Sequence, residues 1–320
     1  MKLINVLNIK SWKKRISFPL EYLKIKYLIN KYYKNYFIIA PASNLGETII
    51  TASLMSEFKK KYFAKVVLLT NKKLREITKL FKGVDEILTI YAYYPLKKTN
   101  ITSISKSKIF PVFEKYINTD FIPKNMIDSH RYLLGLKEDV KPEKIKLNSD
   151  FLSNIKNKYG LADNTIFLSP EANSLNYKIL YPDFWIKLAD LLISNGYDVV
   201  INSKNNKFKN YNCIFSSVLD TVAIAENCKC VIGFRSGLMD VFALSVSKKI
   251  FAIYPSDNYQ IYLFMSNKNI KNNLNKTKAQ TVLDYSSLNT MYYNENITET
   301  IFDGNIELLI NNIKKFINNI

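Results

Sequence analysis

Short apolar runs alternate with amphipathic segments over much of the chain. Residues 36–42 (YFIIAPA) form an apolar run, and residues 43–62 then place apolar side chains at helical intervals. The alternation continues through residues 64–70, 71–81 and 84–90, which indicate in turn a strand, a helix and a strand. Because these strands are continuously apolar and are separated by helices, the pattern predicts a parallel sheet covered on both faces.

The same alternation restarts after a less regular region at residues 91–160. Strands are predicted at residues 165–170, 197–203, 230–234 and 249–255, with helices at 182–196, 219–228 and 236–246. Two such α/β units in tandem predict two Rossmann-like domains with parallel sheets that face a central cleft. Ligands of such sheets bind at the carboxyl ends of the strands, where loops lead into helix N-termini.

The chain is expected to have four parts. Residues 1–35 form a basic amphipathic segment, 36–155 an N-terminal domain, 156–305 a C-terminal domain, and 306–320 a helix that could cross back to the first domain. Residues 10–35 mix basic side chains with aromatic and aliphatic ones at roughly helical spacing, as in a helix that lies in a membrane interface. A helix that packs its apolar stripe on its own domain would have the same pattern, so both interpretations stay open.

The composition limits the possible class of protein and its cellular compartment. A chain of 320 residues with 48% hydrophobic content can bury two cores, and no apolar window is long enough to span a membrane. We expect no export signal. The odd number of cysteines (Cys213, Cys228 and Cys230) within one apolar segment indicates free thiols and a cytoplasmic protein. The single histidine, His130, is far from them in sequence, so we expect no metal site.

The net charge of +19 comes from 46 basic and 27 acidic residues. It fits nucleic acid, an anionic membrane surface or a phosphorylated substrate as partner, and it also fits a global compositional bias. The 22 tyrosines could stack on bases, but they are scattered along the chain and no nucleic-acid motif accompanies them. A basic nucleic-acid-binding protein is therefore an alternative, not the first hypothesis.

The usual nucleotide-binding motifs are missing from the sequence. Neither G-x-G-x-x-G nor G-x-x-x-x-G-K-[ST] occurs, and no D-x-D pair is present to hold a divalent ion. A nucleotide phosphate would therefore be bound without metal, by helix N-termini and basic side chains.

Residues 230–255 (CVIGFRSGLMDVFALSVSKKIFAIYP) place Arg235 between two apolar runs, with Ser236 and Gly237 at the start of the next helix. Backbone N–H groups, the positive helix end and the guanidinium could converge there on one anion. The alternative is a routine strand-to-helix turn in which Arg235 pairs with Asp240. We expect the first, because an arginine in so apolar a segment is costly unless a negative group meets it.

These residues resemble a known family, the heptosyltransferase-like glycosyltransferases of the GT-B fold (family 9-like). Residues 166–203 and 223–255 are similar to its donor domain: a strand ending in Pro-x-Ala, a lysine, a WP-x-x-x-W-like helix start, a second strand, and a strand followed by a D-S-G-like turn. Residues 44–62 (NLGETIITASLMSEFKKKY) resemble its N-terminal glycine–aspartate helix. The resemblance covers most of residues 36–260.

The sequence departs from that family at three positions. Glu47 stands where the family has aspartate, Arg235 replaces the aspartate of D-S-G, and Asp240 takes roughly the place of its histidine. The RSGL-x-D pattern resembles a variant branch associated with bacterial surface polysaccharide gene clusters. The donated sugar therefore stays open.

The resemblance implies an inverting hexosyl- or heptosyltransferase that uses a nucleotide-sugar substrate and no cofactor. Inversion needs a base for the acceptor hydroxyl and charge stabilisation for the departing phosphate, and Glu47 is the predicted base. A carboxylate that merely complements the helix dipole would occupy the same position. The predicted donor-binding residues are Asn173, Ser174, Lys178, Asn202, Arg235, Ser236, Gly237, Leu238 and Asp240. The predicted acceptor-side residues are Asn44, Gly46 and Thr48.

The first hypothesis is thus a metal-independent glycosyltransferase of lipopolysaccharide or capsule synthesis. Its expected partners are a nucleotide-sugar donor, a lipid-linked or surface glycan acceptor and an anionic membrane surface, with no nucleic acid. We expect a cytoplasmic location, peripheral on the inner face of the plasma membrane. A catalytically inert relative that uses the cleft only for binding is a further alternative, because Glu47 replaces the family aspartate. His130 is left out of the catalytic set, since a lone histidine is more often structural.

Overall fold

The structure is a computed structural model, and it describes most of the chain. The described residues are 23–24, 27–33, 35–41, 44–89, 109–111 (backbone), 125–172, 182–254 and 287–320.

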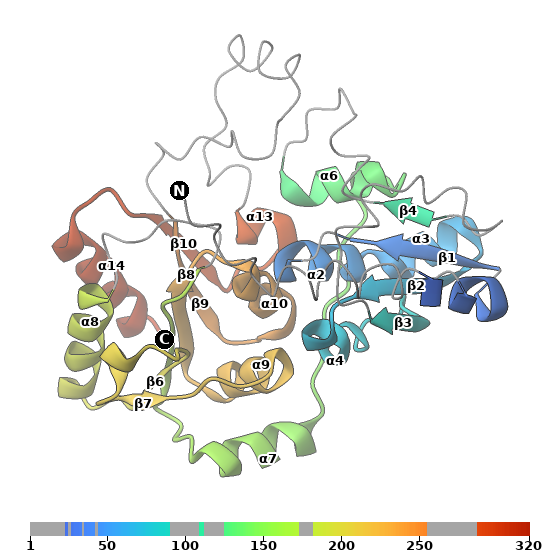
Figure 1. The fold of residues 1–320 in the computed structure, drawn as a ribbon. Helices are drawn as coiled ribbons and strands as arrows, with labels where there is room; N and C mark the ends of the chain where they lie inside the picture. Colours follow the sequence, from blue (N-terminus) through green and yellow to red (C-terminus); the bar gives the residue numbers. More distant parts are fainter. Residues whose placement is uncertain are drawn as a thin grey trace, which may run out of the picture.

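The N-terminal domain is built on a parallel sheet with the strand order β3-β2-β1-β4. Its strands are β1 (Tyr36–Ala40), β2 (Lys65–Thr70), β3 (Glu86–Thr89) and β4 (Ile109–Pro111). Its helical elements are α2 (Leu45–Ser53), α3 (Met55–Tyr62), η1 (Lys72–Leu74), α4 (Arg75–Thr78) and α6 (Met126–Leu133). Strand, turn and helix follow one another from β1 to β3 as the apolar pattern predicted (Figure 1), and the central strands β1 and β2 are largely buried.

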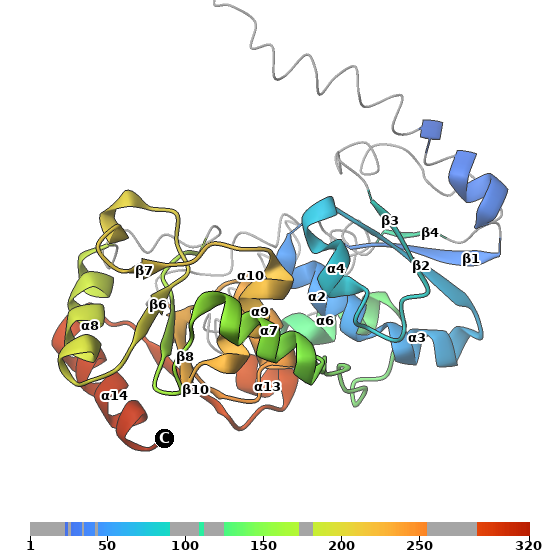
Figure 2. The same ribbon diagram turned by 90° about the horizontal axis from the view of Figure 1, so that it is seen from below.

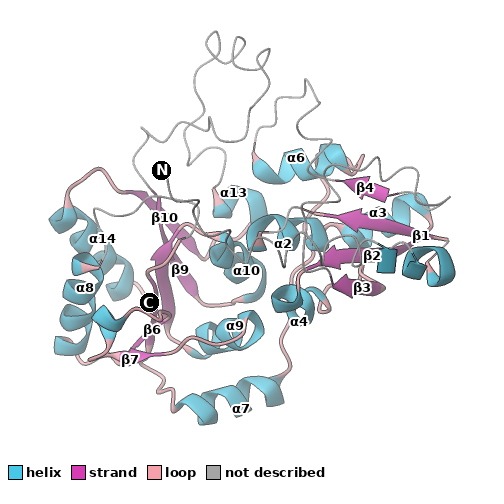
Figure 3. Cartoon of the chain, viewed as in Figure 1, coloured by secondary structure: helices cyan, strands magenta, loops and turns pink. Residues whose placement is uncertain are grey.

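The C-terminal domain has a second parallel sheet with the order β10-β9-β8-β5-β6-β7. Its strands are β5 (Ile166–Ser169), β6 (Val199–Ile201), β7 (Asn212–Cys213), β8 (Cys230–Phe234), β9 (Lys249–Tyr254) and β10 (Ile297–Ile301). Its helical elements are α7 (Ser149–Tyr159), α8 (Asp183–Ser194), η3 (Asn206–Phe208), α9 (Val218–Asn227), α10 (Gly237–Ser245), α13 (Leu288–Tyr292) and α14 (Ile306–Asn318). Helices lie on both faces of this sheet (Figure 3).

Local sequence signals explain most element boundaries. Asn44 caps α2, Ser217 caps α9 and Asn148 caps α7, each with a side-chain oxygen that accepts a backbone N–H of the first turn. The helix predicted after β1 is interrupted at Leu54, where α2 ends and α3 begins. Helix α7 lies within the region that the sequence pattern left irregular, although its asparagine cap and its left-handed Gly160 are recognisable helix signals.

The last helix does not cross back to the first domain, so that part of the prediction is wrong. Helix α14 has a strong apolar stripe, and the stripe packs into a core with residues of α8, β8 and β9; its members are Leu309, Ile313, Phe316 and Ile317. Figure 1 shows α14 beside α8 at the outer side of the C-terminal domain.

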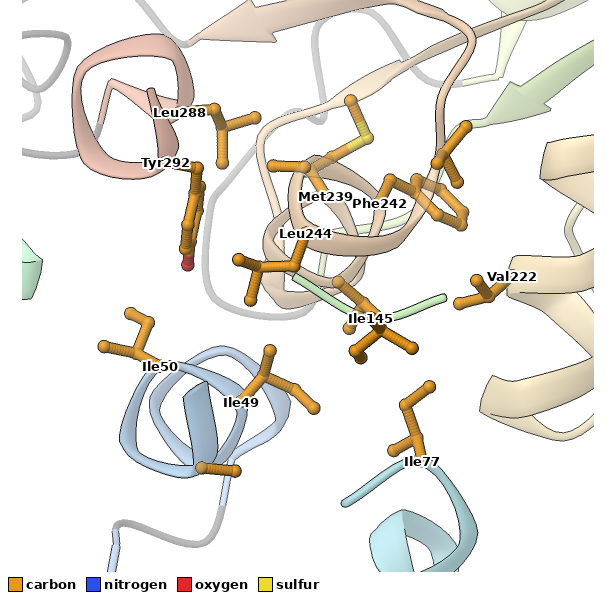
Figure 4. Close-up of a cluster of buried hydrophobic side chains, with 14 of the residues drawn as sticks. Ile49, Ile50, Ile77, Ile145, Val222, Met239, Phe242, Leu244, Leu288 and Tyr292 are labelled. Atoms are coloured by element: carbon orange, nitrogen blue, oxygen red, sulfur yellow. The ribbon is translucent and has the colours of Figure 1, made fainter. Parts of the chain in front are cut away.

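The two domains share one hydrophobic core. Ile49, Ile50 and Ile77 from the N-terminal domain belong to the same cluster as Met239 and Phe242 from the C-terminal domain (Figure 4). The chain between the domains is held to both of them, because Glu143 N donates to the Ser53 carbonyl at 2.8 Å and Ile145 N donates to the Leu244 carbonyl at 2.9 Å. Seen from below, the domains lie side by side with α7 across the space between them (Figure 2).

Within the described ranges, no helix is both long enough and apolar enough to cross a bilayer.

Candidate functional site

Two strand-to-helix junctions, one from each domain, meet at the domain interface. Helix α2 begins after β1, and helix α10 begins after β8. A Cβ atom placed on Gly46 would lie 2.6 Å from Asp240 Oδ2, and one placed on Gly237 would lie 2.7 Å from the Gly46 backbone nitrogen. The two first turns are therefore in direct contact, and glycine at both positions makes this approach possible.

The start of α2 is capped and partly open to solvent. The exposed Asn44 accepts the backbone N–H of Glu47 with Oδ1 at 3.1 Å, and Glu47 itself is half-buried. Thr48 is buried, and its hydroxyl donates to the Asn44 carbonyl at 2.7 Å. Of the three acceptor-side residues predicted, Asn44 lies on the surface, whereas Gly46 and Thr48 face the protein interior.

The start of α10 contains a closed ion pair. Arg235 is 5% exposed and Asp240 is 2% exposed. Nη1 of Arg235 lies 2.9 Å from Asp240 Oδ2 and 2.8 Å from the Ser236 carbonyl, while Nη2 lies 2.8 Å from Asp240 Oδ1. The structure thus has the pairing that the sequence analysis named as the alternative for Arg235, in a two-pronged geometry.

A tyrosine completes this buried network. The Tyr292 hydroxyl, on α13, donates to Asp240 Oδ1 at 2.9 Å. Burial lowers the pKa of Arg235, but the charge of Asp240 outweighs it and leaves the pKa above its ordinary value. Burial and the Asp240 charge raise the pKa of Tyr292 well above its usual range. Arg235 therefore stays charged, Tyr292 stays neutral, and each Asp240 oxygen receives a hydrogen bond.

The side-chain hydroxyl of Ser236 takes no part in this network, although its carbonyl does. Ser236 precedes the first residue of α10, but its side chain does not cap the helix. Its hydroxyl oxygen is buried and has no hydrogen-bond partner in the part of the chain that the structure describes. The first N–H groups of a helix also lack intrahelical acceptors. The junction therefore combines an unused hydroxyl with the positive end of a helix.

Of the remaining predicted donor-binding residues, Asn202 and Leu238 are described and three others are not. Asn202 follows β6 and is half-buried, and its backbone N–H donates to the Leu168 carbonyl at 2.9 Å. Leu238, in the first turn of α10, is also half-buried. Asn173, Ser174 and Lys178 lie outside the described residues.

His130 is a buried residue of α6, as expected for a structural histidine. Its Nδ1 lies 3.0 Å from the Met126 carbonyl. Burial lowers the pKa of His130 to about 4, against the opposing effect of that hydrogen bond. The neighbouring Arg131 pairs with Asp128 at 2.6 Å. His130 is therefore neutral near pH 7.

Sequence reasoning missed two features of this site. Tyr292 is 52 residues away from Asp240, and nothing in the pattern around it indicates a polar partner. The contact between Gly46 and Gly237 joins two helix starts from different domains. Each glycine was recognised as part of a helix start, but not as a partner of the other.

No group of three or more histidine, cysteine, aspartate or glutamate side chains within the described ranges is arranged to hold a metal ion. Cys228 and Cys230 are free cysteines, and burial raises the pKa of each thiol to about 12. Both thiols are therefore protonated near pH 7.

Two Rossmann-like domains with strand carboxyl ends directed toward a shared junction define the GT-B fold class, and solved structures share this fold. The chain is similar to the ADP-heptose LPS heptosyltransferase II of E. coli, with 14% identity and a TM-score of 0.62 over 89% of this chain and 99% of that one. It is similar to a family 9 glycosyl transferase from Veillonella parvula, with 13% identity and a TM-score of 0.56 over 88% and 89% of the chains.

A third similar structure is the E. coli heptosyltransferase WaaC with ADP-2-deoxy-2-fluoro heptose. Its identity is 12% and its TM-score 0.56, over 89% of this chain and 99% of that one. No protein-family model matches the sequence, and no curated protein matches it either. The likeness therefore establishes the GT-B fold.

Proposed function

We propose that this protein is a glycosyltransferase that transfers a sugar from a nucleotide-sugar donor to a glycan acceptor, with inversion and without a metal. The observation that carries the proposal is the contact between two helix starts, one with the half-buried Glu47 and the other with the unused Ser236 hydroxyl. The shared fold supports it, since the similar WaaC structure contains an ADP-linked sugar analogue. A base and a phosphate site in contact are the two elements that inverting transfer needs.

The donor phosphate would bind at the start of α10. The Ser236 hydroxyl has no partner among the described residues, and the first N–H groups of the helix, which no side chain caps, would bind the phosphate with it. Arg235 would act mainly through this arrangement, because its guanidinium holds the Ser236 carbonyl as well as Asp240. Donor contacts from Asn173, Ser174, Lys178 and Asn202 remain part of the proposal.

Glu47 would take the proton from the acceptor hydroxyl. It lies in the first turn of α2, whose helix start touches that of α10. A carboxylate that accepts a proton during transfer needs access to the acceptor, and partial exposure of Glu47 supports this role.

The acceptor would be a lipid-linked or surface glycan of the lipopolysaccharide or capsule type. The protein would then work at the inner face of the plasma membrane, as a peripheral protein. The basic and aromatic composition of residues 10–35 supports this location.

A thermal-shift screen of nucleotide sugars tests the donor part. A true donor at a hundred times its dissociation constant should stabilise the protein by about 2.7 kcal/mol. The decisive variant is Ser236→Ala. Removal of a buried hydroxyl without a partner should leave the free energy of unfolding unchanged or raise it slightly, while donor affinity falls by about fivefold or more.

One control variant and two further outcomes sharpen this test. Ser194→Ala, on the exposed side of α8, should change neither quantity. A donor that binds Ser236→Ala as tightly as the wild type would contradict the phosphate assignment. Binding of a donor without any transfer to acceptors would identify an inert GT-B binding protein instead of an enzyme.

A further inference from the structure

An unbroken series of aromatic and lysine contacts covers one outer surface of the N-terminal domain. Lys31 Nζ lies 5.3 Å from the centre of the Tyr27 ring and 5.1 Å from that of Tyr32. The rings continue edge to face from Tyr32 through Tyr33 to Tyr36, where Lys65 lies 5.6 Å above the ring. We call this surface the aromatic–lysine band; its members are Tyr27, Lys31, Tyr32, Tyr33, Tyr36 and Lys65.

The band is anchored on the sheet by a buried isoleucine and by two of its own rings, Tyr33 and Tyr36, which pack on the same hydrophobic cluster. Ile29, in the helical stretch 27–32, is 1% exposed and packs on the β1–β2 part of the sheet, against Ile38 and Val67 among others. Tyr27 and Tyr32 are 56% and 57% exposed, so their rings are accessible from outside the domain. Figure 2 shows this stretch on the face of the sheet opposite α3 and away from the C-terminal domain.

Two exposed apolar side chains accompany the band. Phe63 is 94% exposed and is two residues before Lys65, whose partner in the β1–β2 register is Tyr36. It ends α3 in a left-handed conformation with φ 48°, which is unfavourable for a bulky residue. Leu23, just before the helical stretch, is 57% exposed. Neither side chain gains from solvent exposure, so both favour an apolar partner.

The charge around the band is positive. Lys31 and Lys65 belong to the band and are exposed, and Lys24, just before the helical stretch, is exposed as well. The acidic groups nearby are largely matched: Asp85 pairs with Lys59, and Glu57 pairs with Lys60. Glu86 lies near Tyr33 and, together with burial, raises the pKa of that tyrosine. An anionic partner therefore complements the surface.

We propose that the aromatic–lysine band, with Leu23 and Phe63, is the surface by which this protein docks on an anionic lipid bilayer. Tyrosine rings favour the bilayer interface, lysines attract anionic headgroups, and apolar side chains enter the acyl boundary. A nucleic acid could use the rings and lysines, but the aliphatic Leu23 offers it no stacking surface. The docking surface deepens the membrane part of the proposed function and rests on it for its biological purpose.

Flotation with unilamellar vesicles tests the docking surface directly. The full chain is mixed with vesicles of phosphatidylcholine alone, or with vesicles of equal parts phosphatidylcholine and phosphatidylglycerol. We expect binding to the anionic vesicles that weakens as salt is added. The triple variant Tyr27→Ser, Tyr32→Ser and Phe63→Asn should bind at least about tenfold less, because it loses the rings that enter the interface.

The variants are chosen so that misfolding cannot imitate the result. Asparagine tolerates the left-handed conformation, so Phe63→Asn alone should keep the full thermal midpoint and still lower binding. Lys31→Ser should lower binding by about fivefold at low salt. The matched control is Phe215→Asn, which removes an exposed ring with a lysine, Lys204, 4.2 Å above it in the other domain.

Three outcomes would overturn the docking surface. Vesicle binding that is unchanged in the triple variant is the first. Loss of binding to single-stranded oligonucleotides in the same variant, with vesicle binding unaltered, would assign the band to nucleic acid. A dimer that dissociates in the variant, without vesicle binding in either form, would assign it to a second copy. None of these measurements involves a sugar donor, so they fail or succeed independently of the thermal-shift screen.

Discussion

Helix α2 follows β1 and helix α10 follows β8, so each begins at the carboxyl end of a parallel strand, yet their polar groups are used differently. Asn44 caps α2, and the carboxylate of Glu47 stays half-buried at its first turn. No side chain caps α10, and the two charges next to it, Arg235 and Asp240, neutralise each other inside the protein.

The difference indicates that the two junctions have different roles in the proposed reaction. The α2 junction has an acidic side chain, the half-buried Glu47, in its first turn, and a carboxylate is a group that can accept a proton. The α10 junction pairs its two charges and has a buried Ser236 hydroxyl without a partner among the described residues, at a helix start that no side chain caps; the proposed phosphate site uses these groups without an exposed cation. An arginine next to a helix start is thus no proof of a direct anion contact.

The largest expected effect comes from Glu47→Gln. The variant keeps the side-chain shape but cannot accept a proton, so turnover should fall by about 10² to 10⁴-fold with little change in donor affinity. Initial rates with the best donor from the thermal-shift screen measure it. Glu57→Gln, on the neighbouring α3, is the control and should retain full activity. A Glu47→Gln enzyme with normal turnover would show that the α2 junction supplies no base.

The Arg235–Asp240 pair should have the next largest effect, on stability. Arg235→Ala leaves Asp240 buried without its counter-charge, so the free energy of unfolding should fall by about 3–5 kcal/mol in denaturant titration. Arg75→Ala, at an exposed position on α4, should cost far less. The double variant Arg235→Met with Asp240→Leu should recover much of the loss, because it removes both charges together.

Donor affinity of that double variant decides between the two roles of Arg235. If the pair only holds the α10 junction, calorimetric titration of the folded double variant should give donor affinity close to that of the wild type. A loss of tenfold or more, about 1.4 kcal/mol, would instead support the direct phosphate contact expected from the sequence.

The contact between the junctions can be broken sterically with Gly46→Ala. Alanine within a helix is normally favourable relative to glycine, but here its Cβ would lie 2.6 Å from Asp240 Oδ2. We expect the free energy of unfolding to fall by about 1–3 kcal/mol. Gly160→Ala is the comparison, because no atom lies within 4 Å of its added Cβ and only backbone strain remains. Stabilisation by Gly46→Ala would mean that the helix starts can separate at no cost.

The smallest expected effect is that of EDTA. If the α10 junction binds the donor phosphate with neutral donors and a helix end, transfer should proceed at the same rate with and without the chelator. Loss of activity in EDTA, restored by Mg²⁺ or Mn²⁺, would contradict this expectation and indicate ligands other than the residues proposed.

The sequence predicted β1, β2, β3, β5, β6, β8 and β9 because their signals are local, but it did not predict the edge strands β4, β7 and β10. Continuous apolar runs such as residues 230–234 need no distant partner to be recognised as buried strands. The positions of Glu47, Arg235 and Ser236 at strand-to-helix junctions followed from the same pattern. The direction of a side chain within a junction did not follow, since Arg235 could reach outward to an anion or back to Asp240.

The alternation of the main strands and helices, the two-domain organisation and the helix starts that form the candidate site were thus predictable from the sequence alone, since burial periodicity and capping act over a few residues. The tertiary structure decided which distant groups meet: Tyr292 with Asp240, Gly46 with Gly237, and α14 with its own domain. Such partners are selected by the packing of whole elements, because each one satisfies a buried polar group or fills a space that exists only after the sheets have assembled.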